Sequence, residues 1–94
     1  MKAGAAARVA VNLPTPLTIY TDGRRDVTAS GSTLDELLHD LDHQFPGMRF
    51  RMIDELGRGR AHMKFFLNGA QQRDLAANIR EGDRLMIVAA ISGG

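Results

Sequence analysis

The sequence contains no cysteine. The chain therefore has no disulfide, no thiolate site for zinc or an iron–sulfur cluster, and no cysteine nucleophile. An excess of charge of one sign is also missing, because 12 Lys and Arg face 11 Asp and Glu and leave a formal net charge of +1. A protein that binds the phosphates of a nucleic acid carries a much larger basic excess. Nucleic acid is therefore not an expected partner.

Long hydrophobic runs are absent as well. No segment approaches the roughly 18 apolar residues of a membrane-spanning helix. The opening MKAGAAARVAV is too short for a secretory signal and is interrupted by Arg8. We therefore expect a cytoplasmic protein with no membrane partner. The 94 residues, 44% of them hydrophobic, are enough for one domain that buries roughly 65% of its unfolded surface. We expect a single domain over residues 1–94, with a flexible N-terminus (1–7) and a projecting C-terminal tail (91–94).

Two strands are predicted in the first third of the chain. Val9, Val11 and Leu13 alternate with polar or small residues, and this run ends at Pro14, which has no N–H for a sheet ladder. β-branched residues then lie on both sides of Asp22-Gly23, a dipeptide that readily adopts positive φ. We therefore expect the first strand to pair with a second strand near residues 26–29.

One amphipathic helix is predicted over about residues 33–45. Its apolar residues repeat at i, i+3, i+4, i+7 and i+11, namely Leu34, Leu37, Leu38, Leu41 and Phe45. Thr33 with Glu36 forms a capping box, Ser32 with Asp35 offers an alternative one residue earlier, and Pro46-Gly47 ends the helix.

The second half of the chain contains at least two further strands. MRFRMI predicts an irregular turn or a short helix, and GRGR predicts a loop. MKFFLNGAQQ predicts a strand with Phe65 and Leu67 on one face and Phe66 on the other, followed by a hairpin at Asn68-Gly69. The segment from Leu75 to Ile79 predicts a short helical turn, and RLMIVAAIS predicts the final strand.

This order of elements predicts an α+β fold in which one main helix packs on one face of a mixed sheet of four to five strands. The right-handed crossover through the helix places the final strand parallel to the first, at the centre of the sheet. That position accounts for LMIVAA, which is apolar at every residue. Leu37, Leu38 and Leu41 should then pack on the inward side chains of the strands, namely Val9, Val11, Phe65, Leu67, Leu85 and Ile87.

Several stretches together resemble a known group of proteins. VAVNLPTPL, TLDELLHDL, FFLNG and the ending EGDRLMIVAAISGG are similar to the ubiquitin-like β-grasp sulfur carriers of the MoaD/ThiS superfamily. The resemblance covers nearly all of the chain from Arg8 onward. Its most specific part is EGD, an apolar strand and a terminal Gly-Gly. Within the superfamily, the spacing of PT, AS, TL and GD looks closest to the cysteine-synthesis carriers.

The resemblance implies a carrier and not an enzyme. In that chemistry an ATP-dependent activating enzyme adenylates the C-terminal carboxylate, here that of Gly94, and sulfide then converts it into a thiocarboxylate. The carrier binds no permanent cofactor, because the activating enzyme uses the ATP. The expected partners are this adenylyltransferase or sulfurtransferase of the ubiquitin-activating type, a sulfur-accepting biosynthetic enzyme, and in some cases a metalloprotease that trims the tail.

The Gly-Gly ending also suits acyl chemistry on physical grounds. Gly93 and Gly94 have no Cβ, so they can pass through a narrow channel, and the carbonyl carbon of Gly94 is unhindered. Three alternatives stay open: a ubiquitin-like modifier joined to a lysine through Gly94, an interaction domain in which the tail has no role, and a molybdopterin-synthase small subunit. The acceptor of the sulfur, whether a cysteine precursor, a thiazole, a dithiolene or another metabolite, is also open.

A docking surface follows from the alternation in the last two long strands. If Phe65, Leu67, Leu85 and Ile87 face the helix, then Phe66, Met86 and Val88 face away from it, on the uncovered side of the sheet. Exposed apolar side chains that cluster beside a projecting tail are typical of a partner site. Together with Ile91 and Ser92 of the tail, they form the predicted partner-binding set.

Two other groups of residues are possible sites. Arg49, Arg51, Arg58, Arg60 and Lys64 form a locally basic stretch, which is either a solvated loop or a surface that steers an acidic partner. Asp35, His39 and His43 repeat every four residues on the polar side of the helix, a spacing that suits metal ligands but equally a solvated face. We predict no metal site.

Overall fold

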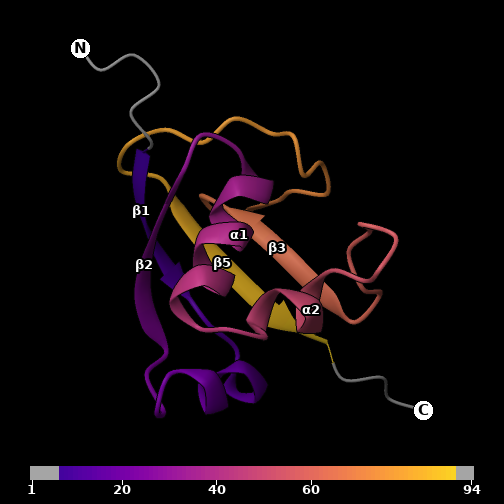
Figure 1. Cartoon of the computed structure of the whole chain (residues 1–94). Helices are drawn as coiled ribbons and strands as arrows, with labels where there is room; N and C mark the ends of the chain where they lie inside the picture. The colour runs from indigo at the N-terminus through magenta and orange to yellow at the C-terminus, as the bar shows by residue number, and fades with distance from the viewer. Residues whose placement is uncertain (1–6, 91–94) are drawn as a thin grey trace.

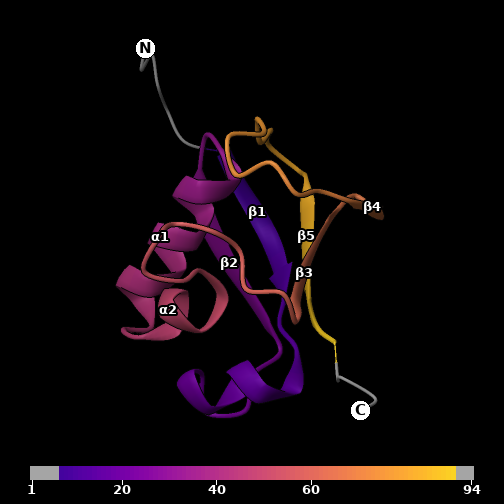
Figure 2. The ribbon, with the colours of Figure 1, turned by 90° about the vertical axis from the view of Figure 1, so that its right-hand side faces the viewer.

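A computed structural model describes residues 7–90 of the chain. Its strands form one five-stranded sheet in the order β2-β1-β5-β3-β4, and its helices lie on one side of that sheet (Figures 1 and 2). In chain order the elements are β1 (Ala7–Asn12), the 3-10 helix η1 (Thr15–Tyr20), β2 (Asp26–Gly31), α1 (Leu34–Gln44), α2 (Met48–Met52), β3 (Met63–Leu67), β4 (Ala70–Gln71) and β5 (Arg84–Ala89).

The sheet has the predicted mixed topology. β1 pairs antiparallel with β2 and parallel with β5, and β5 pairs antiparallel with β3. The final strand therefore lies at the centre, parallel to the first, as the crossover rule predicts. In Figure 2 the helices α1 and α2 cover one face of the sheet, and no described element covers the other. We call this second face the open face.

Helix α1 begins where the sequence predicts, and its first N–H groups have partners. The hydroxyl oxygen of Thr33 accepts a hydrogen bond from the Glu36 N–H, while the Glu36 carboxylate accepts one from the Ser32 N–H, one residue before the cap. The N–H groups of Leu34 and Asp35 donate to the carbonyl oxygens of Ala77 and Leu75. The segment before β5 thus satisfies donors that have no partner within the helix.

The core lies between α1 and the sheet. Leu37, Leu38 and Leu41 are completely buried, as predicted, and they belong to one cluster with the inward side chains of the strands. Of the six predicted inward strand residues, five are buried, namely Val9, Val11, Phe65, Leu85 and Ile87. Leu67 packs against this cluster but is only partly buried, because it is the last residue of β3 before the hairpin.

Two local predictions need correction. The residues between β1 and the Asp22-Gly23 turn form the 3-10 helix η1, which the β-branched pattern did not indicate. The segment from Leu75 to Ile79 forms no helix and contains only one hydrogen-bonded turn, from the Ala77 N–H to the Asp74 carbonyl oxygen. Its backbone groups instead pair with the start of α1, through a bridge between Thr33 and Asn78 and a hydrogen bond from the Ile79 N–H to the Ser32 carbonyl oxygen. Both turn dipeptides do adopt positive φ, at Asp22-Gly23 and Asn68-Gly69.

Gly31, at the junction of β2 and α1, is a position where only glycine fits. A Cβ there would lie 2.8 Å from the backbone nitrogen of Leu37 and 2.9 Å from the backbone carbon of Glu36. These atoms belong to the first turn of α1 and cannot move without shifting the helix. We expect Gly31→Ala to lower the free energy of unfolding by about 1–3 kcal/mol, measured by chemical denaturation.

Gly59→Ala is the matched control for this variant. A Cβ at Gly59 would lie 3.8 Å from a ring carbon of Phe65, which is an ordinary contact. We expect its stability to match the wild type within about 0.5 kcal/mol. Equal stability of the two alanine variants would show that α1 does not pack against β2 as described.

Candidate functional site

Phe66 and Met86 lie opposite each other on the open face. They are partners in the register between β3 and β5, so their side chains project side by side. Met86 is 49% exposed and Phe66 is partly buried. The alternation predicted from the sequence therefore gives the correct face for both residues.

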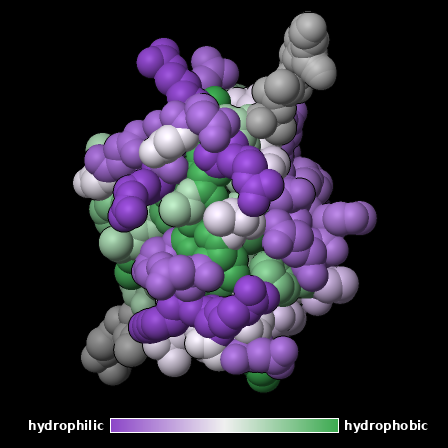
Figure 3. All heavy atoms as spheres, turned by 90° about the vertical axis from the view of Figure 1, so that its left-hand side faces the viewer, coloured by the Kyte–Doolittle hydropathy of each residue, from purple (hydrophilic) through white to green (hydrophobic). Residues whose placement is uncertain are grey.

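Val88 extends this apolar surface toward the end of β5. It lies two residues after Met86 on the same face, opposite Lys64 of β3, and is partly buried. We call Phe66, Met86 and Val88 the open-face patch. Figure 3 shows the β2 side of the molecule, where a band of hydrophobic surface lies between hydrophilic side chains. The open-face patch lies on another side, on β3 and β5. Exposed apolar side chains that lie together are typical of a docking site.

Two shallow hollows adjoin the patch, and Met86 lines both. One, of about 430 Å³, also involves Ala10, Asn12 and Phe66. The other, of about 350 Å³, also involves Pro14 and Val88 and reaches Ala89, the last residue of β5. The apolar surface therefore continues from the hairpin between β3 and β4 to the point where the chain leaves the sheet. A flexible Met side chain between two hollows can adapt to partners of different shape.

A polar contact fixes the start of β5, and with it the position of Met86. The Asn68 side-chain amide donates to Asp83 Oδ1 (2.9 Å), and the Arg84 N–H donates to Asn68 Oδ1 (3.0 Å). The Arg80 N–H donates to Asp83 Oδ2 (2.8 Å). The hydrogen bond from Asn68, followed by that from Arg80, lowers the pKa of Asp83 below its ordinary value of 3.8. The hairpin signal at Asn68-Gly69 does not predict this link, because the link joins two residues that are 15 positions apart.

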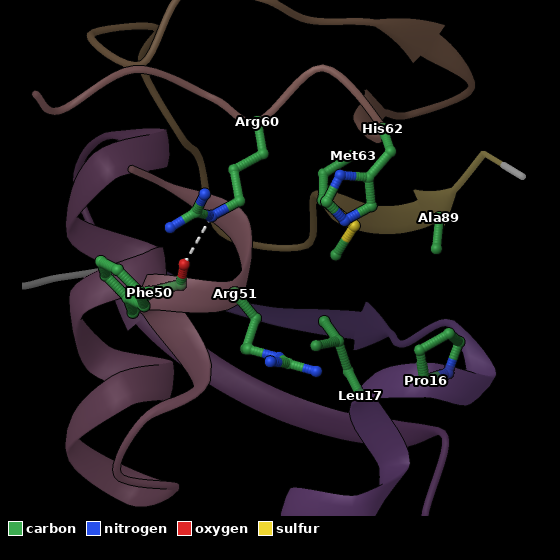
Figure 4. A pocket seen from close by; sticks show the side chains of 8 residues that line it. All are labelled: Pro16, Leu17, Phe50, Arg51, Arg60, His62, Met63 and Ala89. Carbon is green, nitrogen blue, oxygen red and sulfur yellow. Dashed lines mark hydrogen bonds between the residues drawn. The ribbon is translucent and has the colours of Figure 1, made fainter. Parts of the chain in front are cut away.

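The basic stretch from Arg49 to Lys64 is divided among different contacts. Arg49 forms an ion pair with Asp35 (3.0 Å) and Arg58 one with Asp54 (3.7 Å). Backbone N–H groups, first that of Arg58 and then that of Leu56, lower the pKa of Asp54. Arg51 and Arg60 instead line a pocket between η1, α2 and β3 (Figure 4). This pocket was not anticipated, because residues 16 and 60 are far apart in the sequence.

The histidines of α1 lie on its exposed side. His39 Nε2 is 3.5 Å from Asp35 Oδ2, and the other oxygen of that carboxylate binds Arg49. His43 is exposed one turn later. Within residues 7–90 no group of three or more His, Asp or Glu side chains is arranged to hold a metal ion. In the same part of the chain, no helix is long and apolar enough to cross a membrane.

Four of the predicted site residues lie outside the described residues. These are Ile91, Ser92, Gly93 and Gly94. The structure therefore places the three strand residues of the partner-binding set together on one face and leaves the tail residues as predictions.

Comparison with known proteins identifies the family. The model of the ThiS family matches residues 9–94. The chain belongs to the ThiS family. The sulfur carrier protein CysO of Mycobacterium tuberculosis is 34% identical to this ThiS-family chain over 91 residues, which cover 92% of this chain and 98% of CysO. The resemblance to the sulfur-carrier superfamily is thereby confirmed.

Solved structures agree with this assignment. The crystal structure of Mycobacterium tuberculosis CysO matches with a TM-score of 0.84 and 32% identity, over 88% of this chain and 99% of that one. The Amycolatopsis orientalis BexX/CysO complex matches with a TM-score of 0.83 and 29% identity, over 92% and 99%. SAMP1 of Haloferax volcanii, at 23% identity, 94% and 100% coverage and a TM-score of 0.80, shows the shared fold alone. The ubiquitin-like β-grasp fold of this ThiS-family chain is confirmed.

The contact between Asn68 and Asp83 predicts a dependence of stability on pH. Because the pKa of Asp83 is lowered in the folded state, the stability that its carboxylate contributes is complete above about pH 4 and is lost as the pH falls through the folded pKa. We expect Asp83→Asn to lower the melting temperature clearly at pH 7. At pH 2.5 the difference from the wild type should be smaller. An equal difference at both pH values would show that the ionised carboxylate does not stabilise this turn.

Proposed function

We propose that this ThiS-family chain is a sulfur carrier that acts through Gly94. The Gly94 carboxylate attacks the α-phosphorus of ATP on an activating enzyme and displaces pyrophosphate, which gives an acyl adenylate. Hydrosulfide delivered by that enzyme system then attacks the acyl carbon and AMP leaves, so that the chain ends in a thiocarboxylate. The carrier is a co-substrate in these steps and supplies no catalytic group of its own.

The position of the central strand supports this proposal. β5 is held between β1 and β3, ends at Ala89 next to the open-face patch, and precedes Gly94 by only five residues. An enzyme that binds the patch therefore lies close to the residues that follow Ala89. Membership in the ThiS family and the similarity to the sulfur carrier CysO support the same chemistry.

The proposal includes two kinds of partner. One is the activating enzyme, which uses the ATP, and the other is an enzyme that takes the sulfur into a small metabolite. The CysO protein of Amycolatopsis orientalis is found in a complex with BexX, so a relative does associate with a second protein. A tail-trimming protease enters only where residues follow Gly94 in the precursor.

The first test concerns the tail. We expect deletion of Gly94 to abolish formation of the thiocarboxylate when the chain is incubated with its cognate activating enzyme, ATP and sulfide. Intact mass spectrometry measures the product. Gly93→Val should slow the same reaction at least tenfold, because a branched Cβ obstructs a narrow channel. Gly59→Val is the control for a valine elsewhere, because the backbone of Gly59 has no positive φ and a Cβ there makes only an ordinary 3.8 Å contact. Normal rates for Gly93→Val would refute the role of Gly93 as the residue that gives access.

The second test concerns the open-face patch. Met86→Asp and Phe66→Asp should weaken binding to the activating enzyme by roughly 1–3 kcal/mol, as the loss of central interface anchors does. Leu56→Asp is the matched control, because Leu56 is also an exposed apolar residue, 69% accessible, but lies in the loop after α2. Isothermal titration calorimetry gives the affinities and thermal denaturation checks the fold. Folded Asp variants that bind as tightly as the wild type would place the docking surface elsewhere.

A further inference from the structure

A pocket lies beside the end of β5, on the helix side of the molecule. Its volume is about 370 Å³, and η1, α2, the start of β3 and Ala89 of β5 surround it (Figure 4). The side chains of Leu17 and Met63 form a buried apolar wall. Because Ala89 also lines a hollow on the opposite side, the chain leaves β5 between the open-face patch and this pocket.

The cationic side of the pocket is held in a defined position. Arg60 donates a hydrogen bond from Nε to the Phe50 carbonyl oxygen (2.7 Å), and its guanidinium carbon lies 4.5 Å from the centre of the Phe50 ring. These two contacts orient the guanidinium while its terminal nitrogens make no hydrogen bond within residues 7–90. A positioned guanidinium with free terminal N–H groups is suited to bind a carboxylate.

The pocket carries positive charge without a matching acid. Arg51 and His62 line it together with Arg60, and no Asp or Glu does. In the part of the chain that the structure describes, the ion pairs involve Arg49, Arg58 and His39, but neither Arg51 nor Arg60. The pocket therefore combines apolar surface and positive charge, which suits a ligand with an apolar side chain and an anionic end.

The chain itself supplies such a ligand. We propose that residues 91–94 bind in this pocket, with Ile91 against Leu17 and Met63 and the carboxylate of Gly94 at Arg51 and Arg60. This rests on the proposed function, in which Gly94 carries the free carboxylate. Four residues span up to about 13 Å, and the segment starts two residues after Ala89 at the rim. The two glycines allow the backbone conformations that a return toward the pocket requires.

This bound state has a consequence for activation. The docked tail leaves the open-face patch free for the activating enzyme, but the carboxylate must leave the two arginines before it can attack ATP. The pocket thus acts as a resting site for the tail between encounters with partners. Removing its positive charge should release the tail without changing the patch.

The test compares two forms of the 94-residue protein by NMR, one ending in the Gly94 carboxylate and one in the carboxamide. The carboxamide has the same length but no charge. At low salt we expect the backbone signals of Arg51 and His62 and the Arg60 Nε–H signal to differ between the forms several-fold more than those of Phe66 and Met86. In 1 M salt the difference should shrink, because the charges are screened.

Charge variants identify the residues responsible. Arg51→Gln and Arg60→Gln should each reduce the difference in NMR signals between the carboxylate and carboxamide forms. Arg60→Gln also removes the contact with Phe50. If that loss disturbs folding, Arg51→Gln alone still tests the proposal. Arg58→Gln is the control, since it removes the same charge from an exposed side chain paired with Asp54. Differences that stay confined to residues 93 and 94, or that persist unchanged in both pocket variants, would overturn the proposal.

The outcome is independent of the test of the proposed function, because the NMR comparison uses the protein alone. Formation of a thiocarboxylate together with unchanged pocket signals would refute only the resting site. A docked tail that no activating enzyme modifies would refute only the sulfur-carrier chemistry.

Discussion

The structure depends on the position of β5 between β1 and β3. Because β5 is paired with a strand on each side, its register is fixed. The alternation of its side chains sends Leu85 and Ile87 into the core and Met86 and Val88 to the open face. A shift of one residue would bury the patch and expose the core. The same pairing that stabilises the fold therefore fixes the open-face patch and the point at which the chain leaves β5.

Both ends of β5 are tied to other parts of the chain. At its start, Asn68 and Asp83 join two turns, and at its end the Ala90 N–H donates to the His62 carbonyl oxygen. The segment before β5 also supplies acceptors for the first N–H groups of α1. Such contacts place the patch, the pocket and the beginning of the tail on a rigid support.

The sequence predicts the elements with strong periodicity, and through them most of the sheet. The leucine repeat of α1 and the alternation around Phe66 and Met86 are local signals that burial enforces, so the topology and the face of the patch follow. The 3-10 helix η1, the irregular pairing near Asn78 and the pocket at Arg60 could not be predicted. The last two depend on contacts between segments that are distant in the sequence, and propensity carries no information on these. The hydrogen bonds of η1 are local, such as that from the Leu17 N–H to the Pro14 carbonyl oxygen, but its β-branched residues favour a strand.

The central claim is that Gly94 carries sulfur and is not joined to another protein. The most direct measurement is the intact mass of the chain after incubation with its activating enzyme, ATP and a sulfide source, with cellular proteins present as potential conjugation targets. The account predicts a free chain in which one oxygen has been replaced by sulfur, and its disappearance when the acceptor enzyme and substrate are added. A ladder of heavier conjugates, or a mass that never changes, would contradict it.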